Sequence, residues 1–84
     1  MSLGDAFGQV LKAHRKRAGF SQEELAHRAK MHSTAISLYE RGLRQPSLYT
    51  VFNLAKVLGL QPSALVADVE GNFATQQKPG AVDG

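Results

Sequence analysis

The apolar residues of this 84-residue chain recur at three- and four-residue spacing, which is typical of helices that bury one side. The first such stretch covers residues 7–18, and a glycine follows it where a helix often ends. No stretch reads convincingly as a β-strand. The pattern predicts an all-α protein with further helices over residues 21–29, 33–41, 48–58 and 62–69.

The end of the chain lacks this periodicity. From Gly71 onward the sequence GNFATQQKPGAVDG has no helical spacing, and its composition favours a flexible segment. The pattern therefore predicts one domain over residues 5–69 and a flexible tail over residues 70–84.

The second and third predicted helices are separated by only a few residues. Ser21 and Glu24 form a capping-box pattern at the start of the second helix, in which each side chain reaches the other residue's backbone N–H. Two short helices joined by a turn of three or four residues form a helix-turn-helix, in which one helix braces the other.

The third predicted helix has a narrow apolar stripe, Ile36 and Tyr39, and hydroxyl side chains on another side, at Ser33, Thr34 and Ser37. A helix fits the major groove of B-DNA, and short polar side chains let its backbone approach the base edges. The third helix is therefore the candidate for contact with DNA.

The charge of the chain is unevenly distributed. The net charge is only +3, yet eight of the ten Lys and Arg residues and only four of the seven Asp and Glu residues precede Pro46. A basic front half suits a polyanion partner, and an ordinary solvated surface explains the same charge equally well. Basic residues on both flanks of the third helix would meet phosphates if it entered the groove.

Composition excludes several classes of protein. The chain has no cysteine, which excludes a disulfide framework and fits a reducing cytoplasm. No apolar run approaches the ~20 residues that span a bilayer. The start, MSLGDAFG, lacks the features of a secretory signal. We therefore expect a cytoplasmic protein that does not enter a membrane.

Catalysis and metal binding find no support among the motifs. His14, His27 and His32 have no cysteine or clustered carboxylate to join them in a metal site. No nucleophile with a histidine partner and no phosphate-binding glycine loop occurs either. We expect neither an enzyme nor a cofactor.

Several segments match one family in order: SQEELA, then IS-x-Y-ERG, then R-x-PSL-x-T, then LAKVLGL, between about Val10 and Leu65. With these segments the chain resembles the Cro/repressor-type helix-turn-helix domain, often called the XRE family. The segment MHSTAIS is similar to the HRTYIS variant of restriction–modification controller proteins. The resemblance implies a five-helix, lambda-repressor-like fold and a transcriptional regulator that binds double-stranded DNA.

The resemblance also implies roles for individual residues. Arg15 and Glu40 match a pair that forms an internal salt bridge in many members. His32, at the start of the third helix, could cap that helix or touch a phosphate. The remaining DNA-contact candidates are Gln22 for a phosphate, Ser33, Thr34, Ser37 and Leu38 for the base-facing side, and Arg41, Arg44 and Gln45 for the following loop.

The chain departs from the family at three of these positions. Lys30 occupies the turn position that usually holds Gly, so a positive φ there would cost on the order of 1 kcal/mol. Leu38 and Ser33 stand where relatives often carry longer polar or basic side chains. Fewer bidentate contacts to bases would shift specificity toward the loop arginines and DNA shape.

Two partner hypotheses remain open for a domain this small. The first is a homodimer on a palindromic operator, with an interface built from the apolar residues that exceed the needs of a small core, Leu60, Leu65, Val66 and Val69. The second is a protein-interaction module on the same fold, such as an antitoxin or adaptor, whose tail from Glu70 binds a partner and folds on contact.

Overall fold

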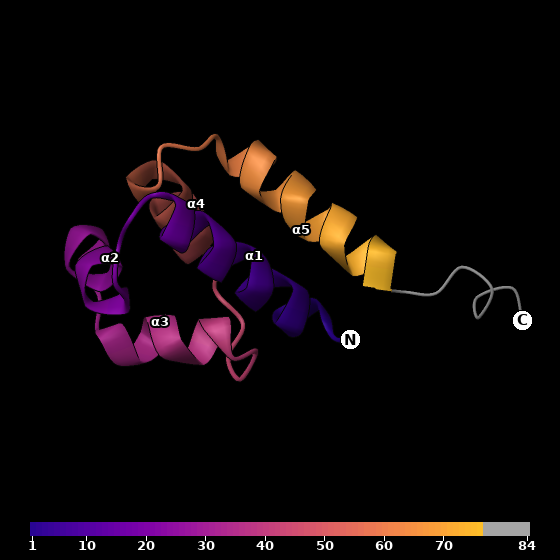
Figure 1. The fold of residues 1–84 in the computed structure, drawn as a ribbon, viewed down its shortest axis with the longest axis horizontal. Coiled ribbons are helices and arrows are strands. Elements are labelled where there is room, and N and C mark those ends of the chain that lie inside the picture. The colour runs from indigo at the N-terminus through magenta and orange to yellow at the C-terminus, as the bar shows by residue number, and fades with distance from the viewer. Residues whose placement is uncertain (77–84) are drawn as a thin grey trace, which may run out of the picture.

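The computed structural model describes residues 1–76 and contains five helices in that range, as Figure 1 shows. They are α1 (Leu3–Arg17), α2 (Gln22–Ala29), α3 (Ser33–Glu40), α4 (Leu48–Val57) and α5 (Pro62–Gln76). No strand occurs among these residues. In Figure 1, α1 lies between α3 and α5, and α1 contacts both. The predicted all-α, five-helix architecture is confirmed.

Each of the five helices contributes one large, completely buried side chain to a common core. Full burial of a leucine or isoleucine stabilises the folded state by about 1.5–3 kcal/mol. Because every helix contributes, the core holds all five elements together. The five side chains are Leu11, Leu25, Ile36, Leu54 and Leu65.

The position of α5 corrects the predicted dimer surface. Leu65 is 0 % exposed and Val69 is 8 % exposed, so both belong to the protein's own core and are not available to a partner. Leu60 is partly buried against the same core, whereas Val66 is 49 % exposed. A run of apolar residues marks a buried surface, but the run alone does not say whether the same chain or another one covers it.

Helix α1 begins four residues earlier than the predicted start at residue 7. Ser2 caps it: the backbone N–H of Asp5 donates to Ser2 Oγ at 3.0 Å, and the backbone N–H of Ser2 donates to Asp5 Oδ2 at 3.2 Å. This reciprocal pair is a capping box, and it gives the first turn of α1 a defined start. The apolar spacing alone did not indicate it.

Helix α5 continues through Gln76, so the predicted flexible tail is wrong for residues 70–76. The Asn72 amide donates to the Ala6 carbonyl and to the Gln9 side chain, both at 3.3 Å, and Phe73 packs against the core. A glycine inside a helix costs only about 1 kcal/mol, which such contacts outweigh. Residues 77–84, with the rest of the predicted tail, lie outside the described residues.

A polar contact also joins α1 to α5. His14 Nε2 lies 2.7 Å from Asp68 Oδ2, and the His14 side chain is 11 % exposed whereas that of Asp68 is 54 % exposed. The sequence indicated no partner for His14. Together with Asn72, this contact fixes α5 alongside α1.

Within residues 1–76, no single helix is long and apolar enough to cross a bilayer. Only α4 and α5 taken together reach the required length and hydropathy, and they meet at a bend of 107°.

Candidate nucleic-acid interface

Helices α2 and α3 are joined by a turn of three residues, 30–32, as a helix-turn-helix requires. Lys30 ends α2 in the left-handed conformation, with φ 58° and ψ 48°, and its N–H donates to the His27 carbonyl at 3.1 Å. The Met31 N–H donates to the Ala26 carbonyl at 2.9 Å. The positive φ expected for a lysine at this glycine position is confirmed.

The two sides of α3 differ as the sequence predicted. Ile36 and Tyr39 are buried. The rings of Tyr39 and Phe7, which belongs to α1, form a T-shaped pair with centroids 6.2 Å apart. On the other side, Thr34 is exposed, and Ser33, Ser37 and Leu38 are partly buried. The predicted base-facing residues therefore share a surface that the core does not occupy.

A close approach between α1 and α3 supports this arrangement. Gly8 of α1 lies against the carbonyl groups of Tyr39 and Glu40, where a Cβ atom would collide with both carbonyl oxygens. Those carbonyls belong to the backbone, so they could move only if the end of α3 moved. The absence of a side chain at Gly8 therefore lets α3 pack directly on α1.

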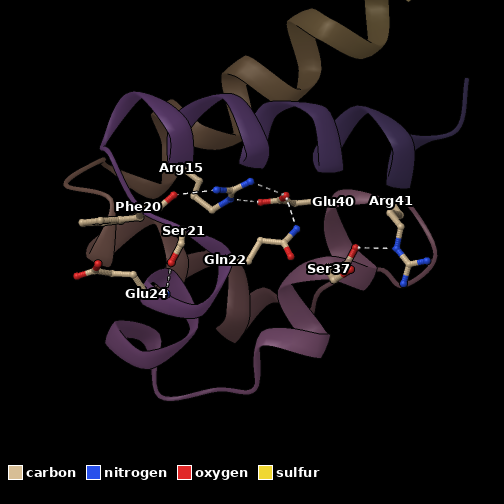
Figure 2. A network of polar contacts seen from close by, with 8 residues as sticks. All are labelled: Arg15, Phe20, Ser21, Gln22, Glu24, Ser37, Glu40 and Arg41. Atoms are coloured by element: carbon tan, nitrogen blue, oxygen red, sulfur yellow. Dashed lines mark hydrogen bonds and ion pairs between the residues drawn. The ribbon is translucent and has the colours of Figure 1, made fainter.

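A buried ionic network beneath the interface connects three helices, as Figure 2 shows. Arg15 Nε donates to Glu40 Oε2 at 2.6 Å, and Arg15 Nη2 donates to Glu40 Oε1 at 3.1 Å. Arg15 Nη1 also donates to the Phe20 carbonyl at 2.8 Å. The two charged side chains are only 9 % and 3 % exposed, so the pair is shielded from water.

The hydrogen bonds to Glu40 raise the pKa of Arg15 above its usual value, although burial acts in the opposite direction. The hydrogen bonds from Arg15 to Glu40 therefore favour the charged form of the guanidinium. The structure thus contains the Arg15–Glu40 pair that the family resemblance implied.

The same network changes the interpretation of Gln22. Its Nε2 donates to Glu40 Oε1 at 2.9 Å, and the residue is partly buried. Gln22 was predicted to contact a phosphate, but in the structure its amide links α2 to the last residue of α3 (Figure 2). This contact ties Gln22 to Glu40, and only the second N–H of the same amide nitrogen could donate to a phosphate.

The loop after α3 carries the basic candidates. Arg41 is exposed and its Nε donates back to the Ser37 carbonyl at 3.4 Å, a long hydrogen bond that keeps the side chain beside α3 (Figure 2). Gly42 turns the chain with a φ of 73°. Arg44 and Gln45 follow and are both exposed. The three predicted loop residues therefore lie on the surface next to the end of α3.

Two basic residues near the turn have defined local roles. His32 occupies the N-cap position of α3, but its side chain makes no capping hydrogen bond, so the capping role that the sequence allowed is not used. Arg28 pairs with Glu24 at 2.9 Å and lies 4.6 Å from the centre of the Phe20 ring. Glu24 was predicted to complete the capping box at Ser21, but its carboxylate accepts from Arg28.

Two features of α4 were not apparent from the sequence. The Asn53 amide donates to the Ala29 carbonyl at 2.8 Å, so α4 holds the end of α2 next to the turn. Leu48, which shares the helical spacing of Val51, Leu54, Ala55 and Leu58, is 71 % exposed, and Tyr49 and Phe52 are 78 % and 53 % exposed. Helical spacing predicted α4 but did not show which of its apolar residues are buried. The core of so small a domain covers only part of the apolar surface of this helix.

The fold and this interface define the class of helix-turn-helix transcriptional regulators. The helix-turn-helix family HTH_3 matches residues 11–65, from the middle of α1 to the first turn of α5. The chain therefore belongs to this family, whose members are DNA-binding regulators, repressors and controllers rather than enzymes.

Two sequence relatives illustrate this membership. The control protein C.BamHI of Bacillus amyloliquefaciens is 41 % identical over 61 residues, which cover 71 % of this chain and 75 % of that protein. The immunity repressor protein of Bacillus phage phi105 is 38 % identical over 61 residues, which cover 73 % of this chain and 42 % of that protein.

Solved structures agree with this membership. The restriction-modification controller protein C.AhdI from Aeromonas hydrophila has a TM-score of 0.71 and 35 % identity, over 74 % of this chain and 94 % of that one. The clp gene regulator ClgR from Corynebacterium glutamicum has a TM-score of 0.85 and 25 % identity, over 90 % of this chain and 81 % of that one.

Proposed function

We propose that this protein is a transcriptional regulator that reads an operator by inserting α3 into the major groove of DNA. The observation that carries the proposal is the outward side of α3, whose hydroxyl groups lie next to the exposed Arg41 and Arg44. The buried Arg15–Glu40 pair and the contact at Gly8 hold that surface in one orientation. A cytoplasmic location is part of the same proposal, because the protein must reach DNA.

Selection from random duplex DNA tests the proposal directly. We expect enrichment of one sequence motif, and binding to that motif that weakens as salt is raised. Each phosphate contact releases counterions, so the logarithm of the association constant falls by about 0.9 per contact for each unit of log salt. Fluorescence anisotropy between about 50 and 200 mM salt measures this slope. Absence of a motif, or binding that ignores salt, contradicts the proposal.

Arg44→Ala tests the loop. We expect it to weaken operator binding by roughly 1–3 kcal/mol, as loss of a direct DNA contact does. Lys56→Ala is the matched control, because Lys56 is an exposed basic residue near the opposite end of α4 from this loop. Equal affinities of the two variants would remove Arg44 from the interface.

We further propose that the protein binds a palindromic operator as a homodimer. A two-fold axis would place two copies of α3 about 34 Å apart, one turn of DNA. The interface we propose is the stripe on α4 formed by Leu48, Tyr49 and Phe52, which are all more than half exposed. Apolar side chains grouped on one helix side are typical of surfaces that another protein covers.

Light scattering at micromolar concentration tests the dimer, and we expect twice the chain mass. Phe52→Glu should lower the mass to one chain and weaken operator binding, because a buried charge opposes the interface. Val66→Glu, on the exposed side of α5, keeps the dimer if the α4 stripe is the interface. The opposite result would assign the interface to α5, as the sequence first indicated.

The α4 stripe also favours one alternative, a protein-interaction module on the same fold. In that case another protein covers Leu48, Tyr49 and Phe52, and DNA selection returns no motif. A stoichiometric partner that is lost with Phe52→Glu would support it. The predicted partner-binding tail lies mostly outside the described residues, so this alternative depends on α4.

A further inference from the structure

We propose that Leu38 reads the methyl group of a thymine, so that the operator carries a thymine at a defined position under α3. This inference rests on the proposed DNA-binding function and names the chemistry by which α3 selects its site. It depends on the position of Leu38 around the helix and on which other side chains share that position.

Leu38 lies on the outward side of α3, between the exposed Thr34 and the buried side of the helix, and it is partly buried. It follows the completely buried Ile36 by two residues, which is about 200° around a helix. Thr34 and Arg41 lie four residues before and three residues after Leu38, so they share its side. Leu38 is therefore a branched aliphatic side chain on the side of α3 that would face the base edges.

The other side chains of α3 leave few means of reading bases. Specific contacts in the major groove pair Arg or Lys with guanine, Asn or Gln with adenine, and Asp or Glu with cytosine, whereas apolar groups contact the thymine methyl. Helix α3 has the sequence STAISLYE, without Arg, Lys, Asn or Gln. Its one carboxylate, Glu40, is 3 % exposed and bonded to Arg15 and Gln22.

Three hydroxyl groups, the methyl group of Thr34 and Leu38 therefore remain on α3 for direct contact, and Leu38 is the largest apolar group among them. Serine and threonine hydroxyls contact several bases and discriminate little among them. A leucine offers no hydrogen bond and would leave the polar edge of G, C or A without a partner. The thymine methyl is the one group in the major groove that an aliphatic side chain matches.

Replacement of thymine by deoxyuridine tests this contact, because it removes the methyl group and keeps every hydrogen bond. Each thymine of the selected operator is replaced singly, and the affinity of the full chain is measured by fluorescence anisotropy. We expect about a fourfold loss at one thymine per half-site, the effect of one buried methyl group, and little change at the others.

Substitution of Leu38 then assigns that loss to its side chain. The Leu38→Ala variant should bind the operator with the sensitive thymine no more tightly than the operator with deoxyuridine there. Leu38→Met, which stays apolar and similar in size, should keep most of the difference in affinity between the two operators. Leu3→Ala is the matched control, because Leu3 is a 51 % exposed leucine on α1, and it should leave the fourfold ratio unchanged. Circular dichroism and urea unfolding check that each variant is folded.

The possible outcomes separate this inference from the function on which it rests. A chain that selects no DNA overturns both proposals. A chain that binds its operator but tolerates deoxyuridine at every position overturns the role of Leu38 alone. A deoxyuridine penalty that persists in a folded Leu38→Ala variant also overturns it, because another group would then contact the methyl.

Discussion

Helix α1 contacts α3 on one side and α5 on the other, and the two seams are built differently (Figure 1). The seam with α3 contains the buried Arg15–Glu40 pair and the backbone contact at Gly8. The seam with α5 contains the His14–Asp68 contact, whose carboxylate is 54 % exposed. The polar contact in the α3 seam is therefore shielded from water, whereas the polar contact in the α5 seam is open to water on the Asp68 side.

This difference indicates which of the two contacts is costlier to disrupt. Removal of one partner from a buried ion pair costs about 3–5 kcal/mol, whereas exposed pairs contribute about 0–1 kcal/mol. The contact between α3 and α1 at Arg15 and Glu40 is thus costlier to disrupt than the contact between α5 and α1 at His14 and Asp68.

Glu40→Ala gives the largest expected effect. It leaves the Arg15 guanidinium buried without its carboxylate partner, so we expect the free energy of unfolding to fall by about 3–5 kcal/mol. Urea unfolding followed by circular dichroism measures this change. Glu70→Ala removes an exposed carboxylate from α5 and should stay within about 0.5 kcal/mol of the parent protein. Similar losses of unfolding free energy for both variants would contradict the claim that the buried Arg15–Glu40 pair is costly to break.

Gly8→Ala tests the other component of that seam. The added methyl group would collide with the backbone carbonyls of Tyr39 and Glu40, so we expect a loss of about 1–3 kcal/mol from overpacking. Gly4→Ala is the control one turn earlier, where the nearest atom to a Cβ, the Gly42 carbonyl oxygen, lies at 3.5 Å. A Gly8→Ala variant as stable as Gly4→Ala would show that α3 can move away from α1.

In and next to the α3 seam, the sequence predicted several features, although not the backbone contact at Gly8. The Arg15–Glu40 pair came from a resemblance between spaced motifs, and the positive φ of Lys30 came from its place in a turn that usually holds glycine. The outward hydroxyl groups of α3 followed from helical spacing. These features depend on local patterns or on a family's shared architecture.

The α5 seam was not predictable in this way. His14 and Asp68 are 54 positions apart, and Asn72 lies 66 positions from Ala6. No local pattern marks such contacts, so residues after Gly71 were assigned to a tail. The assignment of Leu65 to a dimer surface failed for the same reason, because the sequence does not show that α1 and α5 share one core.

Gly71→Ala tests whether α5 is helical beyond residue 70, and its expected effect has the opposite sign. Nothing lies within 4 Å of a Cβ at this position, and the residue is exposed inside the helix. Alanine should therefore stabilise the protein by about 0.5–1 kcal/mol through its higher helix propensity. An unchanged free energy of unfolding would mean that this part of the chain is not helical in solution.

Asp68→Ala gives the smallest expected effect and measures the open seam itself. The contact with His14 is short, 2.7 Å, but more than half of the Asp68 side chain faces water, which screens the interaction. We expect a loss of about 0.2–1 kcal/mol, measured by urea unfolding. Asp68→Asn keeps an oxygen acceptor for His14 without the charge, so it separates the hydrogen bond from the electrostatic attraction. A loss as large as that of Glu40→Ala would mean that α5 is held on α1 as firmly as α3, and the contrast between the two seams would not stand.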